Sequence, residues 1–285
     1  MNLASPLRYP GGKGAMAGVL AQIRRLNGLG GRAVVEPFAG GAGASLKLLF
    51  MEETGSVHLN DADPAVHDFW WAVTHQTEKF LDLLNQTPVN IDEWRRQRAI
   101  YRDAEKVSRM ARGFAAFYLN RCNRSGIIIN GGPIGGIDQS GKWKLDARFN
   151  KVSLRQRCQA VAEYRERITV TCLDGVEAIR RTEDGQAFLF VDPPYFHKGK
   201  LLYLNSLSVD YHRTLAETLH ERRDSSWVLT YDDCDEVRRL YEGWATVRPF
   251  SLRYAAAERR QGREVLIVPT GMKLPDEQSS DAIVW

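Results

Sequence analysis

The most constraining stretch of the sequence is AFLFVDPPYF, residues 187–196, in which an apolar run ends in an acid, two prolines and a tyrosine. Five consecutive apolar residues predict a central strand that is buried on both faces. Neither proline has an N–H for a sheet ladder, so the chain must leave the sheet here in an extended turn. Asp192 and Tyr195 are therefore expected at a strand's carboxyl edge, where α/β sheets bind ligands. A rigid exit turn without a ligand is the simpler alternative.

Strands and helices alternate along most of the chain. Helical patterns reach about residue 26, begin again near Pro64, and recur at 151–167, from Gly175, at 210–223 and at 233–242. In GGRAVVEPFAGGAGASLKLLF a short strand is expected to run into a glycine turn and an apolar helix. Further short strands are expected in SVHLND, ITVTCL, AFLFV and WVLTY, and two more follow, ATVRPFSL and REVLIVP. This alternation predicts an α/β fold with a mostly parallel sheet and helices on both faces.

Residues 89–150 interrupt this alternation and carry most of the positive charge. The segment reads as helical to about residue 119 and then as a long glycine-rich loop. Residues 95–157 hold 15 Lys and Arg against 4 Asp and Glu, although the whole chain has a net charge of only +4. A solvated helix surface is one explanation. The interleaved aromatic residues favour a nucleic-acid-binding face instead.

Composition is that of an ordinary globular protein, with 44% hydrophobic residues in 285. No apolar stretch approaches the roughly 18 residues that a membrane span needs, and the start has no apolar signal-peptide core. We therefore expect a cytoplasmic protein with no membrane partner. The four cysteines are widely spaced, which predicts reduced thiols and no metal site.

A glycine turn and a later acid indicate a cofactor with a ribose. Gly40, Gly41 and Gly43 stand between a predicted strand and helix, where a ligand can approach the backbone. Asp61 ends the next strand, where a carboxylate can accept hydrogen bonds from ribose hydroxyls. The spacing is not GxGxxG, and it suits S-adenosylmethionine (AdoMet) as well as a dinucleotide. An ordinary turn remains an alternative for the glycines, as does an N-cap for Asp63.

Six motifs together resemble the Dam-type class, or alpha group, of adenine-specific DNA methyltransferases. They occur in the family's order over about residues 5–270: LRYPGGKG, EPFAGGAG, LNDADP, FYLNRCNRSG, DPPYF and REVLIV. The resemblance implies a Rossmann-like methyltransferase sheet, AdoMet as cofactor and double-stranded DNA as substrate. It implies a catalytic domain formed by residues 1–88 and 151–273, with an inserted DNA-recognition region at 89–150. We expect the polar residues 274–285 to form a disordered tail.

The resemblance also assigns roles to individual residues. The catalytic motif is Asp192, Pro193, Pro194 and Tyr195. The residues expected to bind the cofactor are Tyr9, Lys13, Glu36, Phe38, Gly40, Asp61, Asp174 and Asp192. The residues expected to bind DNA are Asn120, Arg121, Arg124, Lys142, Lys144 and Arg148.

The motif suits methylation of an aromatic amine, which is a poor nucleophile because its lone pair is delocalised into the ring. Asp192 and the Pro193 carbonyl can each accept one amine N–H, which directs the lone pair toward the methyl donor and stabilises the developing positive charge. Tyr195 is expected to stack on a base flipped out of the duplex. No general base is required before attack, and His197 is at least as well explained as a surface residue.

Two departures from the family pattern concern the glycine motif and the recognition segment. Ala42 stands where the family has a second glycine, which we expect to be tolerated because it adds one methyl group. Arg124 and Ser125 replace an aromatic residue and an asparagine of the members that read GATC, so the recognition sequence does not transfer.

Other functions remain alternatives. The same chemistry serves RNA adenine, the cytosine amino group and protein glutamine. A DNA-binding module without activity would not need an intact Asp61 and Asp192, and a nicotinamide dehydrogenase would not explain the basic segment. A cognate restriction endonuclease is a candidate partner, and the sequence leaves the oligomeric state open.

Overall fold

A computed structural model describes residues 5–9, 11–103, 106–196, 207–252, 264–276 and 283–284. His197, whose role the sequence left open, lies outside these residues. The strands are β1 (Ala33–Glu36), β2 (Val57–Asn60), β3 (Ile168–Thr171), β4 (Ala187–Val191), β5 (Ser226–Asp232), β6 (Ala245–Leu252), β7 (Glu264–Pro269) and β8 (Ile283–Val284). The α-helices are α1 (Ala17–Leu26), α2 (Gly43–Phe50), α3 (Pro64–His75), α4 (Thr77–Gln86), α5 (Ile91–Arg102), α6 (Arg109–Cys122), α7 (Lys151–Glu163), α8 (Gly175–Arg181), α10 (Val209–Glu221) and α11 (Asp235–Tyr241).

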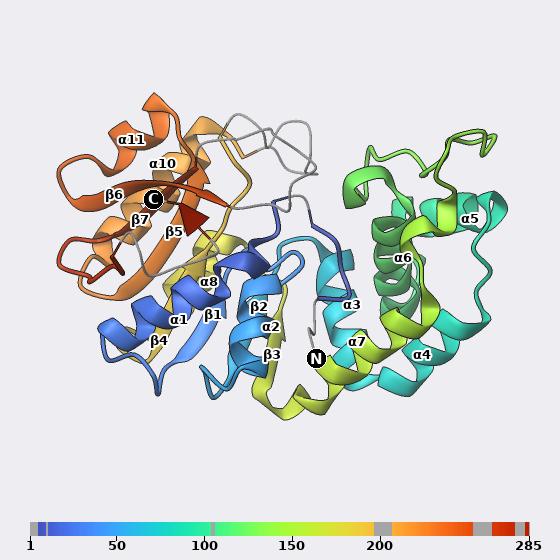
Figure 1. Cartoon of the computed structure of the whole chain (residues 1–285), viewed down its shortest axis with the longest axis horizontal. Coiled ribbons are helices and arrows are strands. Elements are labelled where there is room, and N and C mark those ends of the chain that lie inside the picture. Colours follow the sequence, from blue (N-terminus) through green and yellow to red (C-terminus); the bar gives the residue numbers. More distant parts are fainter. Residues whose placement is uncertain are drawn as a thin grey trace.

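The strands form one sheet in the order β3-β2-β1-β4-β5-β7-β6-β8 (Figure 1). The first five of these strands pair in parallel, and β7 pairs antiparallel with both β5 and β6. The predicted α/β fold with a mostly parallel sheet is confirmed. The order reverses beside β1, and this is the position at which open α/β sheets bind ligands beyond the carboxyl ends of their strands.

The central strands are buried on both faces, as their continuous apolar sequences predict. In β4, Phe188 and Phe190 face one apolar cluster, which includes residues of α1, α2 and α3. Leu189 and Val191 face the other, which includes residues of α8, α10 and α11. The two-residue period of a strand therefore supplies both cores from one segment.

Helix α3 begins at the predicted Pro64 but is shorter than its apolar pattern suggests. The carboxylate of Asp63 caps it by accepting a hydrogen bond from the Ala65 N–H at 2.8 Å, so the N-cap alternative for Asp63 is confirmed. The backbone leaves helical geometry at Gln76, where φ is −134° and ψ is 37°. A separate helix, α4, then starts at Thr77 and changes the direction of the chain.

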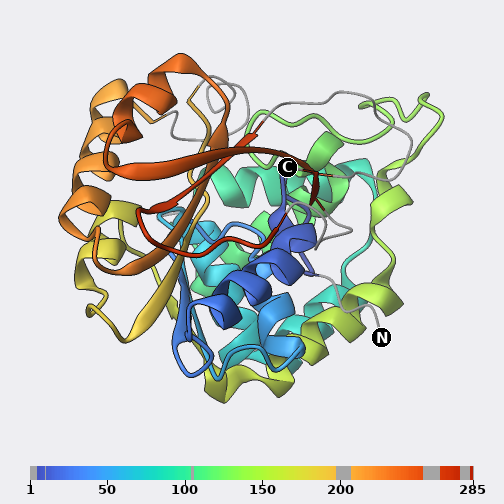
Figure 2. The same cartoon turned by 60° about the vertical axis from the view of Figure 1, so that its left-hand side comes forward.

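The basic insertion is packed directly onto the sheet domain. Its helices α5 and α6 gather with the flanking helices α4 and α7 on the side of α3 away from the sheet (Figures 1 and 2). Gly113 of α6 lies so close to α3 that an added Cβ would be 2.5 Å from the carbonyl carbon of Asp68. Only glycine allows this approach. Among the described helices, none is long and apolar enough to cross a membrane.

The C-terminal segment differs from the disordered tail that its polar sequence suggested. Pro275 is buried, and its carbonyl oxygen accepts a hydrogen bond from Arg248 at 3.1 Å. Ile283–Val284 pairs antiparallel with the end of β6. The prediction is therefore wrong for these residues, because an edge strand offers unpaired backbone groups that even a polar segment can satisfy.

Ala42 has a left-handed conformation, with φ 47° and ψ 30°. This geometry costs a residue with a Cβ about 1–2 kcal/mol. The expectation that one methyl group is its whole cost was therefore incomplete.

We predict that Ala42→Gly changes the free energy of unfolding by less than about 1 kcal/mol. Relief of the strain offsets the lost burial of one methyl group, about 0.8 kcal/mol, and the added freedom of the unfolded chain. Ala44→Gly, a change at a buried residue within α2, should destabilise by about 1–2 kcal/mol. Urea denaturation of both variants measures the difference. Equal losses would contradict the strain at Ala42.

Candidate active site

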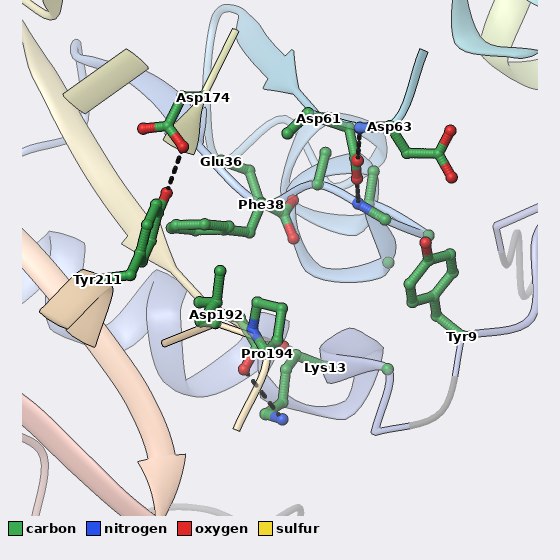
Figure 3. A pocket seen from close by; sticks show the side chains of 18 of the residues that line it. Tyr9, Lys13, Glu36, Phe38, Asp61, Asp63, Asp174, Asp192, Pro194 and Tyr211 are labelled. Carbon is green, nitrogen blue, oxygen red and sulfur yellow. Dashed lines mark hydrogen bonds and ion pairs between the residues drawn. The ribbon is translucent and has the colours of Figure 1, made fainter. Parts of the chain in front are cut away.

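A cavity of about 440 Å³ lies at the carboxyl ends of β1, β2 and β4 (Figure 3). This volume is in the range of small-molecule sites. All eight residues predicted to bind the cofactor line it: Tyr9, Lys13, Glu36, Phe38, Gly40, Asp61, Asp174 and Asp192. The structure thus brings the N-terminal motif, the glycine turn and three strand ends together at one site.

The glycine turn and Asp61 form one end of the cavity. Asp61 accepts hydrogen bonds from the backbone N–H of Gly40 at 2.8 Å and of Asp63 at 2.9 Å, one on each carboxylate oxygen. The Tyr9 ring lies against the turn, where an added Cβ on Gly40 would be 2.8 Å from the ring. Burial raises the pKa of Asp61 to about 7, helped by the charge of Asp63.

Buried Asn60 holds the strand ends beside this turn. Its Nδ2 donates to the carbonyl oxygens of Pro37 and Leu173, both at 2.9 Å. Its Oδ1 accepts from the Leu173 N–H at 2.9 Å and the Thr171 hydroxyl at 2.8 Å. The side-chain amide therefore links the exits of β1, β2 and β3, which explains why asparagine precedes Asp61.

Glu36, the last residue of β1, is almost completely buried in the cavity wall. Burial raises the pKa of its carboxyl to about 8, and the charges of Asp192 and Asp61 act in the same direction. Its Oε2 has no hydrogen-bond partner among the described residues. A buried acceptor without a partner is costly, so this oxygen marks a place where a ligand donor would be stabilising.

The opposite end of the cavity is formed by Asp174, Tyr211 and Phe38 (Figure 3). Asp174 caps α8 by accepting hydrogen bonds from the N–H groups of Val176 and Glu177. Its other carboxylate oxygen accepts from the Tyr211 hydroxyl at 2.8 Å. The Phe38 ring lies so close to Gly175 that an added Cβ would be 2.2 Å from it. The rings of Phe38 and Tyr211 can pack against a flat ring, and the Asp174 carboxylate can accept a hydrogen bond from a polar group on that ring.

The catalytic motif is held by residues from distant parts of the chain. Asp192 Oδ1 accepts a hydrogen bond from the Thr230 hydroxyl at 2.5 Å, and it lies 3.2 Å from the ammonium nitrogen of Lys13. Lys13 also donates to the Tyr195 hydroxyl at 2.5 Å and lies 3.5 Å from Glu264 Oε2. Lys13 is only 3% exposed, so these contacts define its environment.

The turn after the two prolines is also anchored. The Phe196 N–H donates to Asp232 at the end of β5, at 3.0 Å. The Phe196 ring packs against His212 with centroids 4.8 Å apart, and His212 shares a hydrogen bond of 2.5 Å with the Tyr231 hydroxyl. Helix α10 and strand β5 therefore anchor the catalytic turn through Phe196.

The cavity lining is strongly acidic. Among the described residues, it includes five carboxyl groups and one basic side chain. They are Glu36, Asp61, Asp63, Asp174 and Asp192, with Lys13. This charge favours a cationic ligand and disfavours one with a phosphate group.

The six residues predicted to bind DNA lie outside the cavity. Arg124, Lys142, Lys144 and Arg148 are exposed, so their predicted role stays a prediction. Asn120 is fully buried, with its amide bonded to the backbone of Arg8 and Gly126. Its prediction as a DNA contact is therefore wrong. Arg121 is 7% exposed and donates to the Arg148 carbonyl oxygen at 2.9 Å.

Four residues of the site escaped the sequence analysis: Thr230, Asp232, Glu264 and Tyr211. Glu264 lies in the motif REVLIV, so a signal for it existed. The other three are ordinary strand or helix residues by sequence. The fold brings Thr230 and Asp232 to the catalytic turn and Tyr211 to Asp174.

Residues 9–258 match the sequence family described as D12 class N6 adenine-specific DNA methyltransferase. The chain belongs to this family. Membership implies a methyltransferase with AdoMet as the methyl donor. No match is found among the curated proteins.

Solved structures similar to this D12-class methyltransferase are distant in sequence. A conserved hypothetical protein of Streptococcus pyogenes is 12% identical, with 85% of this chain and 89% of that chain covered and a TM-score of 0.33. TrmN from Thermus thermophilus is 12% identical, with 88% and 48% covered and a TM-score of 0.38. The rRNA methyltransferase AviRa from Streptomyces viridochromogenes is 15% identical, with 91% and 86% covered and a TM-score of 0.39.

We predict that Lys13→Met lowers the free energy of unfolding by about 3 kcal/mol at pH 8, because two carboxylates are left without their cation. Burial raises the pKa of Glu264, while Lys13 opposes this rise. Without Lys13 the pKa rises further, so Glu264 takes up a proton as the pH falls and the loss at pH 5 should be smaller. Urea denaturation at both pH values measures this effect.

The matched controls are Lys13→Arg, which keeps the charge, and Lys13→Met combined with Glu264→Gln. The second should cost less than Lys13→Met alone at pH 8. A pH-independent loss, equal in both backgrounds, would show that Lys13 contributes packing rather than charge.

Proposed function

We propose that this methyltransferase transfers a methyl group from AdoMet to the exocyclic amino group of adenine in double-stranded DNA. The single observation that carries the proposal is the arrangement at Asp192. Its Oδ1 is used by Thr230 and Lys13, whereas neither its Oδ2 nor the Pro193 carbonyl oxygen has a hydrogen-bond partner in the described part of the chain. Two fixed acceptors next to a cofactor-sized cavity suit an amine with two N–H groups.

The cavity fits AdoMet by charge. AdoMet carries a sulfonium and an ammonium group against one carboxylate, so its net charge suits an acidic lining. Asp61 would accept from the ribose hydroxyls, and Glu36 Oε2 would accept from the ammonium group. Phe38 and Asp174 would bind the adenine ring and its amino group. A pyrophosphate-containing dinucleotide would meet five carboxyl groups in the same space.

AdoMet supplies an electrophilic methyl group on a positively charged sulfur. The protein's residues act on the acceptor. Asp192 and the Pro193 carbonyl hold the amine so that its lone pair is directed into the cavity, and both stabilise positive charge that develops on nitrogen. Two prolines fix these acceptors before the substrate arrives, so little reorganisation is needed during the reaction. Lys13 and Thr230 fix the carboxylate from the other side.

DNA is the proposed acceptor because the exposed basic residues of the insertion lie beside this domain. Arg124, Lys142, Lys144 and Arg148 suit contacts with phosphates. An adenine inside a duplex is out of reach, so we propose that the base is flipped out, at a cost of a few kcal/mol that phosphate contacts would offset. RNA adenine, cytosine and protein glutamine are the competing acceptors.

The test is methyl transfer from tritiated AdoMet to acceptors supplied separately. Duplex DNA of mixed sequence, RNA of the same sequence and length, and an unmodified protein pool are compared at equal concentration. We expect label in duplex DNA only. Label found mainly in RNA or in protein would contradict duplex DNA as the substrate.

We predict that Asp192→Ala abolishes transfer while the variant still binds duplex DNA. Asp192→Asn should retain part of the rate, because an amide oxygen can still accept one hydrogen bond but lacks the charge. Tyr195→Phe should retain most activity, since the ring face is kept although the hydroxyl contact with Lys13 is lost. Single-turnover rates on a duplex measure all three. An active Asp192→Ala enzyme would refute the assigned role.

We also predict that AdoMet binds about tenfold more tightly at pH 8.5 than at pH 6.5, with release of protons. The pKa of Glu36 is raised to about 8 and that of Asp61 to about 7, so at neutral pH both carboxyls are partly protonated. Binding of a cation favours their ionised forms, and affinity therefore rises as the pH rises. Calorimetry in two buffers with different ionisation enthalpies measures the released protons.

The matched controls are a ligand and a variant. S-adenosylhomocysteine lacks the sulfonium charge and should show a weaker pH dependence. Glu36→Gln should bind AdoMet less tightly and flatten the rise between pH 7 and 8.5. Equal pH dependence for both ligands would mean that the carboxyl groups do not recognise the sulfonium charge.

A further inference from the structure

Four arginines from separate segments lie together beside the active-site domain. They are Arg8, Arg121, Arg148 and Arg157. Arg121 is the innermost, 93% buried, and its Nη1 has no hydrogen-bond partner among the described residues. None of the four forms an ion pair with a carboxylate in the part of the chain that the structure describes.

The protein backbone builds this cluster with several specific hydrogen bonds. The buried amide of Asn120 binds both backbone groups of Arg8, at 2.7 Å to its N–H and 2.6 Å to its carbonyl oxygen. The next residue, Arg121, donates from Nε to the Arg148 carbonyl oxygen at 2.9 Å. Arg157 donates to the Ser5 carbonyl oxygen at 3.2 Å. The four side chains are therefore brought together by anchored segments.

The close approach of two backbones shows how firmly the N-terminal segment is seated here. An added Cβ on Gly126 would be 2.2 Å from the Arg8 carbonyl oxygen. Gly126 has φ +76°, a conformation that favours glycine. Residues 120–126 thus form the surface against which the Arg8 backbone packs.

The electrostatics of the cluster are unfavourable as they stand. Burial, together with the charges of Arg157, Arg8 and Arg148, lowers the pKa of Arg121 to about 10. The pKa of Arg8 is lowered as well, by burial and by Arg148. Buried charges are ordinarily paired, because an unpaired one costs several kcal/mol. An anionic ligand would remove this cost.

We propose that Arg8, Arg121, Arg148 and Arg157 form a binding site for one backbone phosphate of the nucleic-acid substrate. Guanidinium groups match phosphate oxygens in paired hydrogen bonds, and they keep their charge at any pH at which a phosphodiester is bound. The inference rests on the proposed function, since it assigns the anion to the DNA backbone. In this proposal the buried Arg121 binds a phosphate directly, whereas the exposed lysines of the insertion make less ordered contacts with other phosphates.

The site is directly joined to the cofactor cavity. Arg8 is followed by Tyr9, whose ring lies on the glycine turn at Gly40 and Gly41. A phosphate held by Arg8 would therefore fix the segment that forms one wall of the cavity. This connection links the phosphate site to the wall of the cofactor cavity.

The experiment compares Arg8→Gln and Arg157→Gln with Arg155→Gln, a control on the same helix as Arg157 that is also half-buried and makes none of the cluster's contacts. Affinity for a short duplex is measured as a function of salt concentration. Loss of one phosphate contact should reduce the slope of log K against log salt by about 0.9. We expect this reduction in Arg8→Gln and Arg157→Gln but not in Arg155→Gln. Slopes equal to the control's would overturn the site.

A second measurement tests the phosphate site independently of whether the enzyme methylates DNA or RNA. The melting temperature is measured in inorganic phosphate and in chloride at equal ionic strength. Phosphate should raise it in the wild type and in Arg155→Gln, and less in the combined Arg8→Gln and Arg157→Gln variant. An equal rise in all three overturns the site, whether the enzyme methylates DNA or RNA. Methylation of RNA alone, with the expected phosphate response, would refute the DNA substrate and keep the site.

Discussion

The ammonium group of Lys13 is the interaction on which the active site depends. It joins the N-terminal motif to Asp192 at the end of β4 and to Glu264 at the start of β7. These three segments are far apart in the sequence. A buried lysine between two carboxylates is stable only while all three remain together, because any one left alone would be an unpaired buried charge. The catalytic turn is therefore rigid only in the complete fold.

Charge is separated between the two halves of the site. The cavity at the strand ends is acidic, and the insertion beside it is basic. A cationic cofactor and a polyanionic acceptor would each be attracted to a different surface, and their reacting groups would meet at Asp192. The N-terminal segment touches both surfaces, with Arg8 on α6 and Tyr9 on the glycine turn. It is the physical link between the proposed DNA contacts and the proposed cofactor site.

Much of this architecture could be predicted from sequence because it depends on local patterns. The apolar run of β4 predicts a buried strand. The glycine turn and the acids that follow the strands predict side chains and backbone at the carboxyl edge of a parallel sheet. Asn120 could not be assigned in this way, since a polar residue reads the same whether it faces DNA or is buried against Arg8. Thr230 is not marked by any motif. The motif REVLIV marks Glu264, but its contact with Lys13 depends on the pairing of β5 with β7, which local sequence does not encode.

The C-terminal residues also show that local sequence does not predict every contact. A polar segment next to Lys273 gives no apolar pattern, yet Pro275 is buried and Ile283–Val284 adds a short strand to β6. Backbone hydrogen bonds to an open sheet edge require no particular side chains. Such pairing becomes visible only when the edge itself is known.

The most direct test of the account is the chemical identity of the methylated product. Duplex DNA labelled by the enzyme with tritiated AdoMet is digested to nucleosides, which are separated and counted. The proposed function predicts that the label is found in N6-methyldeoxyadenosine. Label in N4-methyldeoxycytidine, or on a ring carbon of any base, would contradict the central claim that these two acceptors hold the amino group of adenine.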